Sequence, residues 1–229
     1  MLPARFEDIP AYPFVRLREL LDGVRPGSSP ISMAVGEPTH PFPPWVIEEI
    51  TKSSLEFNKY PPNEGTVGLR KAISTWILNR YGVEVDPLEE VVPLNGSREG
   101  LYNAAMALCP ETKNGKQPII LMPDPFYQVY MFAALSVGAQ PLYLPSKPET
   151  GFLPDFFSLE KNILNQTAIV YICSPTNPQG AVACQDYWKH LLTLAETYNF
   201  KVFSDECYSE IYRKRPPIGA LEIAKKLRA

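Results

Sequence analysis

Two segments in the first third of the chain repeat apolar residues at the spacing of an amphipathic helix. They are residues 45–55 and 68–80, where apolar side chains recur every three or four positions. A shorter helix is predicted over residues 15–22, because Gly23 and Pro26 follow it and would end it. The rest of the first 30 residues has no periodic pattern. It is therefore predicted to be an irregular arm that is mobile or wraps around a partner.

From residue 91 the pattern changes to short apolar runs that alternate with helical segments. The predicted strands are 91–94, 119–122, 140–144, 168–173 and 201–204, and the predicted helices are 98–108, 127–137 and 186–198. Such alternation is typical of an α/β fold with a mostly parallel sheet and helices on both faces. No repeat or low-complexity tract interrupts it, and no linker clearly separates two domains.

Polar, turn-forming segments follow four of these apolar runs directly. They begin at Asn95, Pro123, Ser174 and Asp205. In open α/β sheets, ligands bind outside the carboxyl ends of the strands. The sequence therefore predicts one binding site built from these four segments.

Several residues in these segments suit a small anionic and aromatic ligand, although each also has an ordinary structural interpretation. Ser97 and Arg98, at a strand-to-helix turn, could hold an anion or simply cap the helix. Asp205 ends an apolar strand, where a buried carboxylate needs a cationic or hydrogen-bonding partner, unless it faces water. The Asn177 amide could donate to a ligand oxygen or belong to a tight loop. The Tyr127 ring could cover a planar ligand or pack in the core.

Composition and charge exclude several classes of function. With 229 residues, 45% hydrophobic and 21% charged, the chain can bury the core of one large domain. A net charge of −3 without a basic block argues against nucleic acid as a partner. The start lacks a signal-peptide pattern and no run of 18 apolar residues occurs, so no membrane association and a cytoplasmic location are expected. The four cysteines form no C-x-x-C pair, so neither a metal site nor a disulfide framework is expected.

Taken together and in this order, the motifs resemble those of the class I/II aminotransferases, which are fold-type I pyridoxal-phosphate enzymes. The matching segments are Gly36-Glu-Pro38, Tyr60-Pro-Pro-Asn-Glu-Gly-Thr-Val-Gly-Leu-Arg70, Asn95-Gly-Ser-Arg-Glu-Gly100, Pro123-Asp-Pro-Phe-Tyr127, Asn177-Pro-Gln-Gly180 and Asp205-Glu-Cys-Tyr208. The resemblance covers nearly the whole chain from about residue 10. It implies an N-terminal arm over residues 1–35 and a partial cofactor-binding large domain over residues 36–229.

The resemblance also implies a role for each polar residue around the ring of pyridoxal 5′-phosphate. Asp205 would pair with the ring nitrogen and keep it protonated, so that the ring can accept electrons from the substrate. Asn177 and Tyr208 would hydrogen-bond the phenolic oxygen, and Tyr127 would stack on the ring face.

The phosphate, the partner subunit and the substrate have implied contacts as well. Ser97 and the backbone around Gly96 and Arg98 would hold the phosphate, joined by Tyr60 from the neighbouring subunit of a homodimer. Gly36 would lie against the carboxylate end of the substrate. The substrates implied are an amino acid and a 2-oxo acid.

Within this family, three segments look most like bacterial succinyldiaminopimelate aminotransferases. They lie at residues 12–23, 151–155 and 204–212. The implied reaction uses succinyldiaminopimelate and 2-oxoglutarate in lysine biosynthesis.

The sequence departs from the family pattern at its end. The family's cofactor-binding lysine lies in a Ser-x-Ser-Lys type segment after the Asp-x-x-Tyr strand, and its substrate-binding arginine lies in a C-terminal domain. No lysine of this sequence has that context, so no catalytic residue is assigned and a truncated chain, inactive alone, is expected. Two alternatives remain open: a non-catalytic remnant or interaction protein that keeps a dimerisation surface, and a pyridoxal-phosphate lyase or decarboxylase of the same fold.

Overall fold

The computed structural model describes residues 3–7, 9, 11–31 and 33–228. The chain divides into two compact units, Met1–Asn63 and Glu64–Ala229. This division lies beyond the predicted arm of residues 1–35, and the predicted domain bounds stay a prediction. Residues 1, 2, 8, 10 and 32 of that arm lie outside the described residues.

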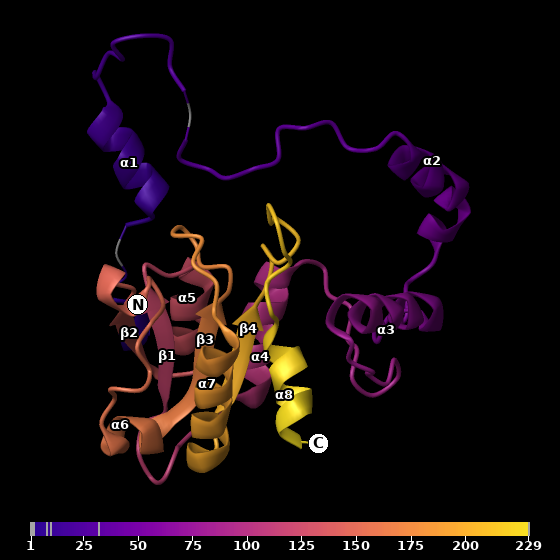
Figure 1. Ribbon diagram of the computed structural model, residues 1–229. Coiled ribbons are helices and arrows are strands. Elements are labelled where there is room, and N and C mark those ends of the chain that lie inside the picture. The colour runs from indigo at the N-terminus through magenta and orange to yellow at the C-terminus, as the bar shows by residue number, and fades with distance from the viewer. Residues whose placement is uncertain (1–2, 8, 10, 32, 229) are drawn as a thin grey trace. The chain divides into compact units, whose positions relative to one another are not determined.

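The first unit consists of short helical segments joined by irregular chain (Figure 1). They are η1 Ala4–Phe6, α1 Pro13–Leu21, α2 Trp45–Lys52 and η2 Ser54–Asn58. The helices expected over residues 15–22 and 45–55 are therefore present. None of the described residues in these four segments is buried.

The second unit is built on a sheet of four parallel strands in the order β2-β1-β3-β4. The strands are β1 Ile119–Asp124, β2 Gln140–Pro145, β3 Thr167–Cys173 and β4 Lys201–Asp205. Each coincides with one of the predicted apolar runs. The expected α/β class with a parallel sheet is confirmed.

The two central strands are buried on both faces, and their side chains alternate between two cores. Ile119 and Leu121 of β1 pack in one core, with α6 Lys161–Gln166, α7 Gln185–Tyr198 and α8 Ala220–Arg228. Ile120 and Met122 pack in the other, with α4 Ser97–Leu108 and α5 Gln128–Ser136. Figure 1 shows the first group of helices in front of the sheet and the second group behind it. Continuous apolar sequence in β1 and β3 follows from this double coverage.

The helix α3 Val67–Tyr81 begins and ends on specific local signals. The Thr66 hydroxyl oxygen accepts a hydrogen bond from the Leu69 amide, and Gly82 ends the helix with a φ of +66°. Within the described part of the chain, no helix is long and apolar enough to cross a bilayer.

The predicted strand at residues 91–94 is wrong, because these residues form extended chain that joins no sheet. Pro93 removes one ladder donor, and the Val91 carbonyl accepts from the Arg70 side chain of α3 over 3.1 Å. Two helices exceed the predicted pattern. The helices α6 and α8 lie outside the helices predicted above, and α8 buries Ile223.

Candidate functional site

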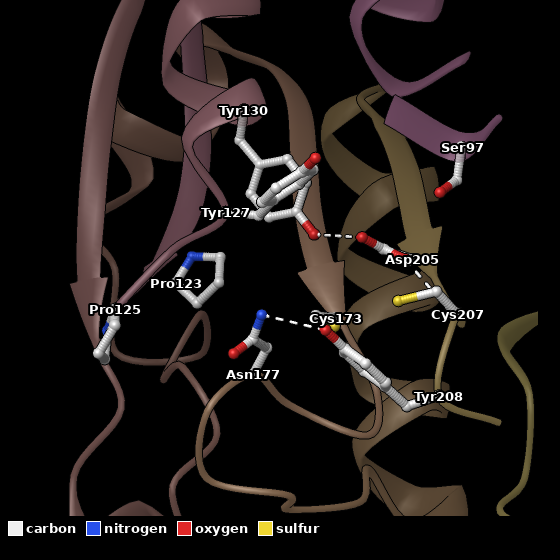
Figure 2. Close-up of a pocket in the computed structure, with 10 residues that line it drawn as sticks. All are labelled: Ser97, Pro123, Pro125, Tyr127, Tyr130, Cys173, Asn177, Asp205, Cys207 and Tyr208. Carbon is white, nitrogen blue, oxygen red and sulfur yellow. Dashed lines mark hydrogen bonds between the residues drawn. The ribbon is translucent and has the colours of Figure 1, made fainter. Parts of the chain in front are cut away.

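The carboxyl ends of the strands meet around one cavity, as expected for an open parallel sheet. The register of β3 and β4 places Cys173 directly beside Asp205. The cavity holds about 230 Å³ (Figure 2). Its lining residues come from the ends of β1, β3 and β4 and from the starts of α4 and α5: Ser97, Pro123, Pro125, Tyr127, Tyr130, Cys173, Asn177, Asp205, Cys207 and Tyr208.

Asp205 forms the buried end of the cavity and is only 7% exposed. Its Oδ2 accepts a hydrogen bond from the Tyr130 hydroxyl over 2.7 Å, and its Oδ1 accepts from the Cys207 amide over 3.3 Å. Among the described residues none forms an ion pair with Asp205. A buried carboxylate that lines a cavity without a protein cation is suited to a cationic ligand group.

The start of α4 forms one wall of the open end of the cavity. Gly96 precedes the helix with φ +110° and ψ 148°, a conformation that essentially only glycine adopts. Ser97 then begins the helix and lines the cavity. Free N–H groups at a helix start, together with the helix dipole, favour an anion such as a phosphate.

The Tyr127 ring covers part of the cavity between these two ends. Its hydroxyl accepts a hydrogen bond from Arg98 Nε over 2.7 Å, which links α4 to the residue that caps α5. Its ring meets the Tyr130 ring edge to face, with centroids 5.8 Å apart. The Tyr127 ring thus has contacts with both Arg98 and Tyr130.

Asn177 and Tyr208 approach each other across the mouth of the cavity, as Figure 2 shows. The Asn177 Nδ2 donates to the Tyr208 hydroxyl oxygen over 3.2 Å. Burial raises the pKa of Tyr208, and the neighbouring Cys207 and Cys173 add to the effect, so this hydroxyl stays protonated at neutral pH. The pair can therefore both donate and accept at one ligand oxygen.

Two cysteines flank the carboxylate, although the sequence spacing predicted no metal site. The ligand atoms of Cys173, Asp205 and Cys207 lie within 4.8 Å of one another. A hydrogen bond with Cys207 and burial both raise the pKa of Cys173, so its thiol stays protonated at neutral pH. The grouping arises from pairing of β3 with β4, which a search for adjacent cysteines does not detect.

Five of the predicted cofactor residues line the cavity together: Ser97, Tyr127, Asn177, Asp205 and Tyr208. Arg98 contacts Tyr127 and Gly96 directly precedes Ser97. Tyr60 and Gly36 belong to the first unit.

Sequence analysis missed three lining residues: Tyr130, Cys173 and Cys207. The spacing of Tyr130, one helical turn after Tyr127, was a signal that could have found it.

The comparison with protein families decides the relationship. The model of "Aminotransferase class I and II" matches residues 28–227. The chain belongs to the class I and II aminotransferase family. Enzymes of this family depend on pyridoxal phosphate, so the expected family and cofactor class are confirmed.

Curated relatives carry the name LL-diaminopimelate aminotransferase. The chain is 36% identical to that of Dehalococcoides mccartyi and 34% identical to that of Aquifex aeolicus, over 96% and 93% of its own length. It spans only 57% and 55% of those proteins. The expected aminotransferase class is confirmed, but these names are not those of the predicted succinyldiaminopimelate enzymes.

A solved aminotransferase from Neisseria meningitidis has the same architecture. It superposes with a TM-score of 0.90 at 35% identity, over 99% of this chain and 58% of its own length. The large-domain fold of the aminotransferases is thus confirmed for the part of the fold that this chain contains.

The residues of the cavity fit pyridoxal phosphate. This cofactor combines a phosphate, a ring nitrogen that can be protonated and a phenolic oxygen. The cavity offers a helix start at Ser97, the buried carboxylate of Asp205, with which no described residue forms an ion pair, and the Asn177–Tyr208 pair. Charge and hydrogen-bonding capacity therefore match group by group.

Proposed function

We propose that this chain forms the cofactor-binding part of a pyridoxal-phosphate-dependent aminotransferase, which transfers an amino group between an amino acid and a 2-oxo acid. The observation that carries the proposal is Asp205. Its carboxylate is buried, lines the cavity and has neutral donors as its hydrogen-bond partners. A protonated ring nitrogen would supply the missing positive charge.

Each of the other lining residues has a part in the proposal. When bound, pyridoxal phosphate supplies a ring that accepts electrons from the reacting substrate. Asp205 holds a proton at the ring nitrogen. Asn177 and Tyr208 hydrogen-bond the phenolic oxygen, and Tyr127 covers the ring face and limits the access of water.

The phosphate is assigned to the start of α4. Ser97 supplies a hydroxyl donor, and the backbone N–H groups after Gly96 supply further donors without a side chain in the way. Arg98 adds positive charge beside this turn.

Two residues of the first unit complete the proposal. Tyr60, whose side chain is fully exposed, is assigned to the phosphate of the neighbouring subunit in a homodimer. Gly36 is assigned to the carboxylate end of the substrate. A Tyr60→Phe variant should lower the affinity for the phosphorylated cofactor only under conditions in which the protein is dimeric by sedimentation.

The proposed substrates are diaminopimelate derivatives, with 2-oxoglutarate as the amino acceptor. The names of the relatives favour LL-diaminopimelate, and the motifs at residues 151–155 and 204–212 favour the succinylated form. The test uses protein expressed together with any coding sequence that continues downstream. This protein is incubated with 2-oxoglutarate and each donor in turn, and the glutamate formed is measured. The donor that yields more glutamate is the preferred substrate.

Cofactor binding can be tested without turnover. We would titrate the chain with pyridoxamine 5′-phosphate, which has no aldehyde and so does not react with surface lysines. We expect saturable binding, which an Asp205→Asn substitution weakens at least tenfold, because hydrogen bonds and charges at buried sites contribute about 1.5–3 kcal/mol.

The matched control is Glu196→Gln, which removes one exposed carboxylate from the far end of α7 and should leave binding unchanged. If the wild-type chain gives no binding signal at millimolar ligand, or if both variants bind alike, the cofactor proposal is wrong.

A further inference from the structure

Tyr130 is a buried residue of the cavity to which the family pattern assigned no role. Its side chain is fully buried, and its hydroxyl donates to Asp205 Oδ2 over 2.7 Å. Because the Cys207 amide occupies Oδ1, each carboxylate oxygen has one donor from the protein. Two donors on different oxygens oppose rotation of the carboxylate about its Cβ–Cγ bond.

The position of the Tyr130 hydroxyl is itself fixed by the rings around it. Its ring stacks on that of Tyr171, with centroids 4.5 Å apart and planes 8° from parallel. The Tyr171 hydroxyl donates to the Leu101 carbonyl of α4 over 2.7 Å, which fixes this second ring in turn. An edge-to-face contact also joins the Tyr130 ring to that of Tyr127. Tyr130 thus connects α4, the ring cover and the carboxylate.

Tyr130 also remains a donor over the whole physiological range. Burial raises its pKa far above the ordinary value, and the charge of Asp205 raises it further. The proton therefore stays on the phenol, and the hydrogen bond to Asp205 keeps one direction.

We propose that Tyr130 is a positioning residue for the cofactor ring: its hydroxyl holds the Asp205 carboxylate in the orientation that meets the ring nitrogen, while its ring contacts that of Tyr127, which covers the ring face. The inference rests on the proposed function. It adds a residue that acts on the cofactor through two others.

A purely structural role would give Tyr130 the same hydrogen bond, because buried tyrosine hydroxyls usually find a partner. The two roles differ in one measurable property. A positioning residue sets the preference for a ring nitrogen over a ring carbon, whereas a structural residue changes stability without changing that preference.

The test compares two ligands on one protein. We would measure dissociation constants for pyridoxamine 5′-phosphate and for its analogue in which C–H replaces the ring nitrogen. The ratio of the dissociation constant of the analogue to that of pyridoxamine 5′-phosphate isolates the contact with Asp205, since the phosphate and the phenolic oxygen are common to both ligands. We expect Tyr130→Phe to reduce the wild-type ratio about tenfold, the size of a hydrogen bond to a charged group.

Tyr187→Phe is the matched control. Tyr187 donates to the Pro154 carbonyl over 2.6 Å from α7, on the opposite face of the sheet. We expect both variants to lower the melting temperature, and only Tyr130→Phe to change the ratio. In an Asp205→Asn background, Tyr130→Phe should have no further effect on the ratio.

A third variant keeps the inference testable if Tyr130→Phe does not fold. Tyr130→para-aminophenylalanine keeps the ring and a weaker N–H donor, so its ratio should lie below that of the wild type and above one. A wild-type ratio in either Tyr130 variant overturns the inference while the cofactor proposal stands. A wild-type chain that binds neither ligand overturns both.

Discussion

The two ends of the cavity are built in different ways. At the buried end, Asp205 and Tyr130 lie below the surface, and stacked rings and two hydrogen bonds fix the carboxylate. At the open end, Ser97, Arg98 and Asn177 are exposed; the first two begin α4 and the third lies on the loop after β3. The buried end is therefore formed before any ligand arrives, whereas the open end depends on how firmly its turns are anchored.

This difference separates two contributions to binding. A rigid, desolvated carboxylate acts strongly on the electronic state of a bound ring, because electrostatic interactions are stronger away from water. An exposed helix start contributes mainly affinity for a charged group, and salt screens it. Variants at the buried end should therefore change the preference for the ring nitrogen, whereas variants at the open end should change the affinity for the phosphate.

The largest effect is expected at Arg70, which anchors the approach to the open end. This buried side chain donates from Nε to the Val91 carbonyl and also to the Leu88 carbonyl. Arg70→Met should lower the free energy of unfolding by about 2–3 kcal/mol, because it leaves the buried Val91 carbonyl without its donor. Urea denaturation measures the loss.

The neighbouring Lys71 is exposed, so Lys71→Met controls for the change of charge on α3. Binding of phosphorylated ligand by Arg70→Met should weaken more than binding of phosphate-free pyridoxamine. If both ligands weaken equally, Arg70 supports the whole unit rather than the open end.

A second effect, smaller and confined to the open end, is expected at Gly96. With φ at +110°, a Cβ at this position imposes a strain of about 1–3 kcal/mol unless the turn rearranges. Gly96→Ala should weaken binding of pyridoxamine 5′-phosphate about tenfold and leave phosphate-free pyridoxamine unchanged, as measured by titration calorimetry.

Gly138→Ala provides the control for Gly96→Ala. Gly138 also has a positive φ, +71°, and a Cβ there would meet nothing within 4 Å, as at Gly96. It lies between α5 and β2, at the other edge of the sheet. Equal losses of affinity in both glycine variants would contradict the local role of the Gly96 turn.

The hydrogen bond between Tyr81 and Glu206, the residue that follows Asp205, should make stability depend on alkaline pH. The Tyr81 hydroxyl donates to Glu206 over 2.8 Å, and burial chiefly, with Glu206, raises the pKa of Tyr81 to about 12. Its ordinary value of 10.0 describes the unfolded chain. The stabilisation is therefore complete below pH 10 and is lost as the pH rises toward about 12.

Between pH 10 and about 12, the melting temperature of Tyr81→Phe should depend less on pH than that of the wild type. The variant should be less stable than the wild type at pH 8, and the difference should shrink as the pH rises. A constant difference across the range would mean that Tyr81 does not titrate with folding.

The regular elements around the cavity could be predicted because their patterns are local. The apolar runs at 119–122 and 168–173 became β1 and β3, since strands covered on both faces need continuous apolar sequence. The run at 91–94 is also apolar but forms no strand, because Pro93 lacks a donor and Arg70 takes the Val91 carbonyl. That competition depends on a residue 21 positions away, which no local pattern contains.

The candidate site was predictable to a similar depth. The chemistry of Asp205 and Asn177 could be recognised from motifs, and the common position of the strand ends follows from the fold class. The neighbours of Asp205 could not be recognised, because Cys173 and Tyr130 reach it through strand register and through helix packing. These neighbours are set by contacts between segments that are distant in the sequence.

The smallest effect is expected at the Tyr127 hydroxyl, which lies where the two ends meet. Its hydrogen bond from Arg98 is exposed, and exposed contacts contribute well under about 1 kcal/mol. Tyr127→Phe should therefore change the affinity for pyridoxamine 5′-phosphate by about twofold, whereas Tyr127→Leu should cost more, because it removes the ring that covers the ligand and meets Tyr130 edge to face. Fluorescence titration of both variants separates ring from hydroxyl. Equal losses would assign the contribution of Tyr127 to its link with α4 and place it with the open end.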